Sequence, residues 1–529
     1  MADDKDKLAE RLKRAREMAA QRGFGTAAAP AAAPPPAAPP ATAAPPAANP
    51  NHDAVRASES LTHRTAGLLE LIANLFKGKP TPPPAPVAPA NAVEPPSFTV
   101  VVAALGGDAD GAAATYLNQS LSERPSLKVK ALGRVFQLDT LEDPSQVSGV
   151  LLNTRHAVAE ENADLLIWGD VGKDGYRLRL ATASGDDDRA ANFGATTRIE
   201  LPLNFPEPVS NLLFAAVLAA AECSTETQKV ALRRLLPAAA TAFEPLAIRP
   251  PVQMSMGQQR SVQQVFGHVA TATALTVPAA EAAPWFEKAV NAYRQAQRRL
   301  GRTDPGWEAG LFHKGIAACL SARAEREKEP VALWEEAITE WRQAVESLPR
   351  ALMPQEWAAA QVRLGVSLYR LDLLTGQTEL LREAVQALQA TLQVYSRTET
   401  PQRWAEVMHN VAQVLEIYGD QLKNPEVLQR AVDACRAVLD IRTRERGPLA
   451  WAATQNTLGS ALFLLDRHSE GGAHLVEAEA AMSSALEVFL AHGAKGPAKV
   501  AAKNLAHVRK VLETRKSRQV IDPHWLDDP

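Results

Sequence analysis

A glycine-rich loop, GGDADG at residues 106–111, is the segment whose composition comes nearest to a known binding chemistry. It follows the apolar run FTVVVAAL and precedes a helix-like stretch, so it connects a predicted strand to a predicted helix. Such a turn can bind phosphate through backbone N–H groups at the helix start. The pattern is neither GxGxxG nor GK[ST], and Asp108 and Asp110 would repel a phosphate unless a metal ion intervened. The sequence favours a plain connection, with a nucleotide or metabolite site near Gly106–Gly111 as the alternative.

The other residues whose side chains could bind a metal ion or act in catalysis are isolated in the sequence. The acidic run GDDD, residues 185–188, lacks the alternating ligand spacing of a calcium site and is interpreted as a solvated turn. The 11 histidines include no HExxH pair, and neither CxxC nor GxSxG occurs. We therefore predict no catalytic residue, no metal site and no cofactor, and interpret the protein as non-enzymatic. Because catalytic triads assemble in space, an uncharacterised hydrolase stays open as a third hypothesis.

Charge and cysteine content restrict the class of protein. The chain has 529 residues with 57 basic and 60 acidic side chains, a balance that indicates neither a nucleic-acid binder nor a membrane-surface protein. The three cysteines, an odd number, form no disulfide framework and suit a reducing compartment. The amino terminus is charged throughout, unlike a signal peptide. The most apolar window, residues 211–223, is shorter than the roughly 20 residues that span a bilayer. We expect a cytoplasmic protein with no membrane span.

Residues 1–97 are predicted to be a mostly disordered arm. Residues 26–50 and 79–97 are rich in proline and alanine and are typical of semi-extended linkers. Short helices are predicted near residues 4–21 and 62–77. The second has one apolar stripe, formed by Leu68, Leu71, Ile72, Leu75 and Phe76. A helix this short needs a surface to pack on, so it is interpreted as a docking helix for the protein's own body, another copy or a partner.

Residues 98–245 are predicted to form an α/β domain. Strand-like runs begin at residues 98, 127, 163, 176 and 196, and helix-like stretches lie between or after them. The turn GKDG, residues 172–175, joins two strand-like runs as a β-hairpin. In the second of these runs, Leu178 and Leu180 alternate with Arg177 and Arg179.

Residues 258–497 are predicted to form five helix-pair repeats, since Trp357, Trp404 and Trp451 are 47 residues apart. A small residue lies eight positions after each of these tryptophans and after Trp307, at Gly315, Gly365, Ala412 and Gly459. A second small residue recurs in all five copies, at Ala289, Ala337, Ala384, Ala431 and Ala478. A larger residue follows four positions later, at Tyr293, Trp341, Leu388, Cys435 and Met482. Small residues let helices approach closely and large ones fill the gaps between repeats.

This spacing resembles the tetratricopeptide repeat, in the long form common in bacterial proteins of that family. The resemblance implies an all-α solenoid, which a capping helix at residues 498–518 and a tail at residues 519–529 would follow. The α/β segment is similar to the amino-terminal domain of TolB-like proteins in the order of its elements and its hairpin. That resemblance implies a binding or assembly module and carries over no functional residue.

The repeat resemblance also implies a partner-binding groove lined by the first helix of each repeat. Counted from the first small residue, the groove-facing side chains are Phe312, Val362, Tyr369, His409, Gln413, Glu416, Asn456 and Phe463. Their mixture of amide, aromatic and apolar groups suits an extended peptide or a helix. We therefore predict a cytoplasmic scaffold that binds protein partners of unknown identity, with self-association as a further expectation and no nucleic-acid contact. The alternative is a regulatory protein whose α/β domain binds a nucleotide or metabolite.

Overall fold

The computed structural model describes residues 98–184, 190–204, 206–469 and 474–521. The predicted arm with its two helices and its docking residues Leu68, Leu71, Ile72, Leu75 and Phe76 lies outside these residues. So do the acidic run at residues 185–188 and the final residues 522–529.

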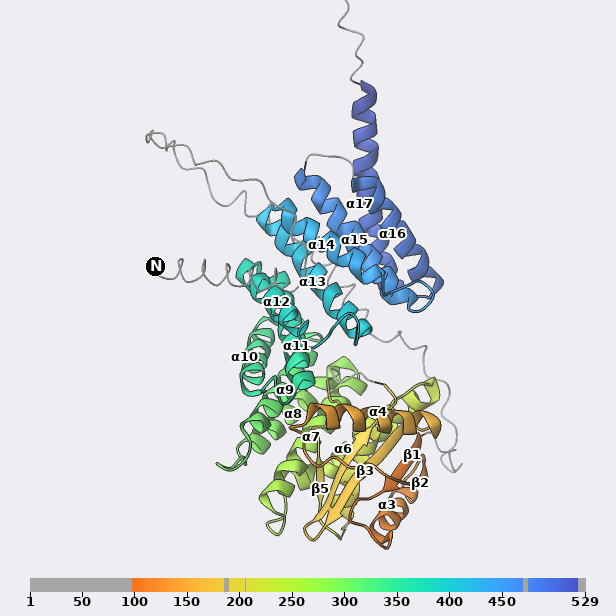
Figure 1. Cartoon of the computed structure of the whole chain (residues 1–529), viewed down its shortest axis with the longest axis vertical. Helices are drawn as coiled ribbons and strands as arrows, with labels where there is room; N and C mark the ends of the chain where they lie inside the picture. Colours follow the sequence, from red (N-terminus) through yellow and green to blue (C-terminus); the bar gives the residue numbers. More distant parts are fainter. Residues whose placement is uncertain (1–97, 185–189, 205, 470–473, 522–529) are drawn as a thin grey trace, which may run out of the picture. The chain divides into compact units, whose positions relative to one another are not determined.

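A five-stranded mixed sheet opens the described part of the chain (Figure 1). Its strands are β1 (Phe98–Ala104), β2 (Leu127–Val135), β3 (Leu165–Gly172), β4 (Gly175–Ala181) and β5 (Ile199–Leu201). The strand order is β2-β1-β3-β4-β5, with β1 parallel to both β2 and β3. Strands β3 and β4 form the predicted hairpin, in which Gly172 pairs with Gly175. The last strand is only three residues long, shorter than the run expected from residue 196.

Helices cover both faces of the sheet because alternate residues of β1 point to opposite sides. Val100 and Val102 share one core with α3 (Ala112–Ser122) and α5 (Glu207–Ala220). Val101 and Ala103 share a second core with α4 (Pro144–Glu160). Helix α5 contains most of the apolar window at residues 211–223 and is buried on nearly every side, which explains its composition.

Five helix pairs follow the sheet and α6 (Glu226–Ile248), as the 47-residue period predicts. They are α7 (Met256–Thr276) with α8 (Ala279–Gln297), α9 (Gly306–Ala324) with α10 (Val331–Ser347), α11 (Pro354–Thr375) with α12 (Thr378–Thr391), α13 (Pro401–Leu422) with α14 (Pro425–Leu439), and α15 (Pro448–Ser469) with α16 (His474–Ala491). Helix α17 (Lys495–Ile521) packs on α16 and extends the predicted cap at both ends. No helix among the described residues is both long and apolar enough to cross a bilayer.

The small and large residues of the repeat meet as the sequence predicts. A Cβ atom added at Gly365 would lie 2.7 Å from Leu388 Cγ, and one added at Gly459 would lie 2.6 Å from Met482 Cγ. In the first pair, a Cβ at Gly267 would lie 2.6 Å from the ring of Tyr293. Real Cβ atoms do not come this close to other heavy atoms, so glycine at these positions is what allows the paired helices to touch.

The periodic tryptophans have a structural partner that is also periodic. The guanidinium groups of Arg350, Arg397 and Arg444 lie over the rings of Trp357, Trp404 and Trp451, at 5.6, 5.4 and 5.8 Å from the ring centroids. Each arginine lies seven residues before its tryptophan, in the segment that precedes the first helix of the pair. A cation over the face of an indole is attracted by its quadrupole. These contacts tie the end of one helix pair to the start of the next.

Candidate functional site

The glycine-rich loop after β1 does not offer its helix start to a ligand. Asp108 accepts hydrogen bonds from the backbone N–H groups of Ala113 (3.1 Å) and Ala114 (2.9 Å), and Asp110 accepts one from Ala112 (3.1 Å). The loop's own carboxylates therefore bind the donors that a phosphate would need. Residues of the described ranges contain no cluster of three or more His, Cys, Asp or Glu side chains that could hold a metal ion.

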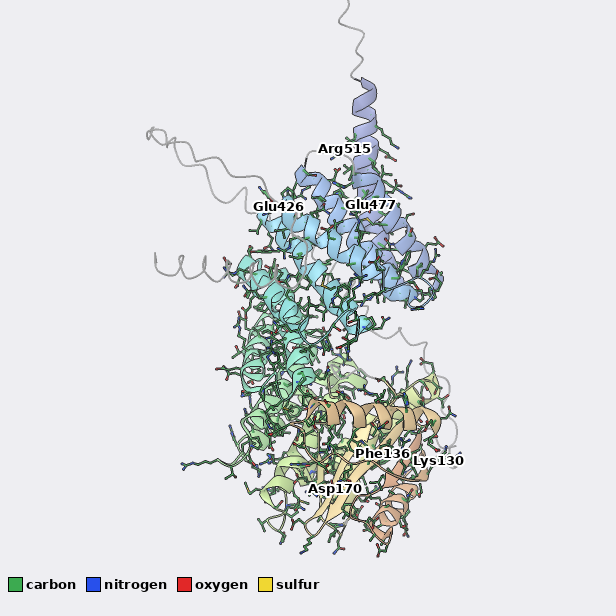
Figure 2. All side chains as sticks on the ribbon, viewed as in Figure 1. Lys130, Phe136, Asp170, Glu426, Glu477 and Arg515 are labelled. Atoms are coloured by element: carbon green, nitrogen blue, oxygen red, sulfur yellow. The ribbon has the colours of Figure 1, made fainter. Side chains whose placement is uncertain are left out.

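The other side of the same loop borders a cavity of about 360 Å³, which we call the strand-end pocket. It lies at the carboxyl ends of β1 and β3, and Figure 2 labels two of its residues, Phe136 and Asp170. Its lining comprises Gly106, Gly107, Phe136, Gln137, Leu138, Asp139, Trp168, Gly169, Asp170, Val171, Arg177, Arg179 and Arg198. Its size falls within the usual range of small-molecule sites.

Two glycines shape this pocket by letting backbones approach each other. Gly107 has a φ of 79°, and a Cβ atom there would lie 2.4 Å from the carbonyl oxygen of Val171. Gly169 has a φ of 145°, and a Cβ atom there would lie 2.1 Å from the carbonyl oxygen of Arg177. Gly106 donates to the Gly169 carbonyl (3.0 Å) and accepts from Val171 N–H (2.8 Å). The loop is thereby fixed against the end of β3.

Three arginines give the strand-end pocket its chemistry. Arg177 donates through Nε to Asp170 Oδ1 (2.6 Å), and Arg198 pairs with Glu200 (2.8 Å). Arg179 is only 5% exposed; its Nε donates to the carbonyl of Ala195 (3.0 Å) and its guanidinium lies 5.4 Å from the Trp168 ring centroid. Burial, together with the neighbouring Arg198, lowers the pKa of Arg179 to about 10, so it stays charged at neutral pH.

The alternation of residues 176–180 could have indicated this cluster. Arg177 and Arg179 stand opposite Asp170 and Trp168 in the β3–β4 register, on the side of the sheet that α4 covers. Sequence reasoning noted the alternation but did not interpret it as a site, because exposed charged faces show the same pattern. What the sequence could not provide is Arg198, which reaches the same cavity from beside β5.

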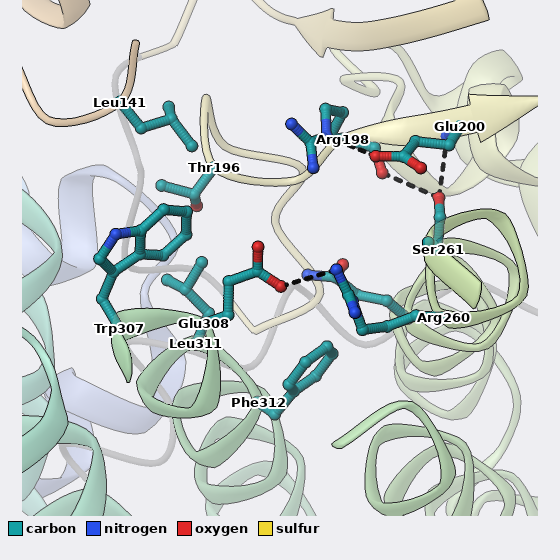
Figure 3. A pocket seen from close by; sticks show the side chains of 12 residues that line it. Leu141, Thr196, Arg198, Glu200, Arg260, Ser261, Trp307, Glu308, Leu311 and Phe312 are labelled. Carbon is teal, nitrogen blue, oxygen red and sulfur yellow. Dashed lines mark hydrogen bonds and ion pairs between the residues drawn. The ribbon is translucent and has the colours of Figure 1, made fainter. Parts of the chain in front are cut away.

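A second, smaller pocket of about 40 Å³ lies where the sheet meets the first helix pairs (Figure 3). We call it the junction pocket. It is lined by Leu141, Thr196, Arg198, Glu200, Gly257, Arg260, Ser261, Gln264, Trp307, Glu308, Leu311 and Phe312. Arg260 pairs with Asp304 (2.8 Å) and Glu308 (3.0 Å). Burial raises the pKa of Glu308 even though Arg260 opposes the shift. Because its charges compensate one another, this pocket fits a structural joint better than a ligand site.

Ser261 connects the sheet to the first helix pair. Its hydroxyl donates to the carbonyl of Arg198 (2.9 Å) and accepts from the N–H of Glu200 (2.9 Å). We expect Ser261→Ala to leave two partly buried backbone groups without their partner and to lower the free energy of unfolding by about 1–3 kcal/mol. Chemical denaturation measures this change. Ser484→Ala is the matched control, because Ser484 donates only within its own helix. Equal stability of the two variants would contradict the proposed role of Ser261 in connecting the sheet to the first helix pair.

The side chains predicted to line the groove are mostly buried. Phe312, Val362, Tyr369, His409, Gln413, Glu416 and Asn456 are between 0 and 7% exposed, and Phe463 is partly buried. The expectation that these side chains face an accessible groove is therefore not met in this structure. Counting along the sequence places them on the first helix of each pair, but these helices run for 19 to 22 residues and are enclosed on most sides.

These buried positions include polar groups with structural roles. His409 Nδ1 lies 3.5 Å from the Thr454 hydroxyl, and burial beside Arg442 lowers the pKa of His409 to about 3. Ser460 donates a hydrogen bond to Glu416 in the neighbouring pair. Burial raises the pKa of Tyr369 well above its usual value. The Tyr369 hydroxyl and the Asn456 amide have no hydrogen-bond partner among the described residues.

Two cysteines are placed where they cannot act as nucleophiles. Cys319 and Cys435 are buried as free thiols. Burial raises the pKa of Cys319 to about 12 and raises that of Cys435 further. Since the thiolate is the reactive form, neither residue has nucleophilic character at neutral pH.

Comparison with known proteins identifies no family for this chain. No protein-family model matches the sequence. No curated protein matches it either. Among solved structures, the chain is similar to a circular tandem repeat protein with novel repeat topology and enhanced subunit contact surfaces, with 13% sequence identity and a TM-score of 0.25. That similarity covers 59% of this chain and 84% of the other.

Proposed function

We propose that this protein is a non-enzymatic cytoplasmic scaffold whose tetratricopeptide-like helix pairs bind a protein partner. The observation that carries the proposal is the array itself, in which five helix pairs follow one another and three of them share one small-to-large contact. Such arrays stack on their neighbours and leave extended surfaces for other proteins. The two buried free thiols fit a reducing compartment. In this proposal the sheet is a TolB-like module that contacts a second protein or another copy.

The best-supported contact surface is an edge of the array and not the buried first-helix residues. Leu374, Leu422 and Val476 are 39, 47 and 66% exposed. Leu374 and Leu422 lie in the last turn of α11 and α13, and Val476 lies in the first turn of α16, so they belong to the third, fourth and fifth pairs. We call these three residues the turn-edge side chains. We propose that these exposed side chains belong to the surface that contacts the partner, since contiguous exposed apolar surface marks protein-interaction sites.

Site-specific photo-crosslinking tests this proposal. p-Benzoylphenylalanine placed at Leu422 or Val476 of the full-length protein is expected to crosslink to the same partner in cells of the native host. The matched control positions are Leu152 on α4 and Val230 on α6, which are 56 and 60% exposed. Mass spectrometry of the crosslinked species identifies the partner. Crosslinks from the control positions alone would contradict the assignment of partner binding to the helix pairs.

A further inference from the structure

The strand-end pocket lies where the connections of the sheet change direction. The chain leaves β1 through α3 to reach β2 on one side, and then returns through α4 to β3 on the other side of β1. Helices α3 and α4 consequently lie on opposite faces, and the carboxyl ends of β1 and β3 border a crevice. In open sheets with parallel strands, this is the position where ligands bind.

Arg179 is a buried cation that lacks a matching anion. No carboxylate among the described residues lies within 4.0 Å of its guanidinium nitrogens, and no described residue accepts a hydrogen bond from its two terminal nitrogens. Its neighbours Arg177 and Arg198 each have a carboxylate partner. A charge that is almost fully buried without a partner is costly. An anion in the pocket would supply the missing partner.

The rest of the pocket lining also has more positive than negative charge. The lining contains three arginines and only two aspartates. Asp139 already accepts hydrogen bonds from the amides of Gln137 (2.7 Å) and Gln146 (3.1 Å). The indole Nε1 of Trp168 is buried and has no acceptor among the described residues. Phe136, Leu138 and Trp168 provide an apolar surface beside the arginines.

We propose that the strand-end pocket binds a small phosphorylated molecule, with Arg179 as its principal charged contact and Arg177 and Arg198 beside it. Guanidinium groups bind phosphate through paired, charge-assisted hydrogen bonds. The apolar wall would contact the uncharged part of the ligand. This site is independent of partner binding by the helix pairs. It also differs from the alternative phosphate site at the start of α3, whose donors are already occupied.

Binding to the full-length protein tests this assignment. The probes are inorganic phosphate, adenosine 5′-monophosphate and citrate, titrated calorimetrically at constant ionic strength. We expect phosphate and adenosine monophosphate to bind and to raise the melting temperature. Arg179→Met should weaken binding by roughly 10- to 100-fold, because charge-assisted hydrogen bonds are lost. Arg233→Met is the matched control, since it removes the same charge from an exposed position on α6.

Two further variants test the proposal even if Arg179→Met fails to fold. Arg179→Lys keeps the charge but loses the planar fork, and is expected to bind phosphate more weakly than the unmodified protein. Arg177→Met changes a more exposed arginine of the same pocket and should also weaken binding. Absence of binding by every phosphate probe would overturn the proposal. So would equal affinity of the Arg179→Met and Arg233→Met proteins, or binding of citrate alone.

Discussion

Replacing Gly267 by alanine is expected to destabilise the protein by about 1–3 kcal/mol or more, although alanine favours helices. The added Cβ would lie 2.6 Å from the Tyr293 ring, which is buried. Gly315 of the next pair lies against the same ring, where a Cβ would be 3.0 Å away, so the ring has little room to move aside. Chemical denaturation of the full-length protein measures the change.

Gly149→Ala is the matched control for this substitution. Gly149 lies within α4, and a Cβ there meets no atom within 4 Å. Alanine should therefore stabilise the protein by up to about 1 kcal/mol at that position. The double variant Gly267→Ala, Tyr293→Leu should recover part of the lost stability, because the smaller side chain leaves space. A stabilising effect of Gly267→Ala alone would refute the close packing described for the first pair.

The second large effect is a loss of stability in acid caused by His409. The pKa of His409 is lowered to about 3 in the folded protein, whereas an unfolded histidine titrates near pH 6.5. Between these values the unfolded chain binds more protons, so stability is fully present above about pH 6.5 and falls as the pH decreases. The loss is about 1.4 kcal/mol per pH unit. We expect His409→Asn to reduce this slope by about that amount without abolishing it, because burial also lowers the pKa of His268 to about 3.

The measurement is the free energy of unfolding at several pH values between about 3.5 and 7, roughly the interval between the folded and unfolded pKa values of His409. His156→Asn is the matched control, since His156 is exposed on α4. Its pH profile should follow that of the unmodified protein. If the His409→Asn profile also kept the full slope, other groups would account for the acid sensitivity and the role given to His409 would be wrong.

The repeat array could be predicted from the sequence because its contacts are local and periodic. In three pairs the small residue meets a large residue about 25 positions away, as Gly365 meets Leu388, and the sequence spacing recurs in every pair. The sheet was accessible from continuous apolar runs such as residues 98–105. The short β5 was harder to delimit, since only Ile199–Leu201 pair with β4 and its flanking residues look equally strand-like.

The candidate sites were harder to predict from the sequence because they depend on contacts between distant segments. Arg177 and Arg179 are close in sequence, but Phe136 and Arg198 join them only through the order of the strands. Burial of the predicted groove residues is likewise a property of the stacked pairs. His409, for example, is a buried polar residue at a position where counting along the repeat predicted contact with solvent or a partner. Pattern alone does not distinguish a buried polar residue from an accessible one.

The most direct test of the proposed scaffold is the affinity for its crosslinked partner when the turn-edge side chains are changed. The triple variant Leu374→Glu, Leu422→Glu, Val476→Glu alters exposed positions and should keep its melting temperature. The control triple variant Leu152→Glu, Leu203→Glu, Val230→Glu adds the same charge to exposed positions outside the helix pairs. We predict that the turn-edge variant binds at least about tenfold more weakly than the control. Equal affinity of the two variants would contradict partner binding through this edge of the array.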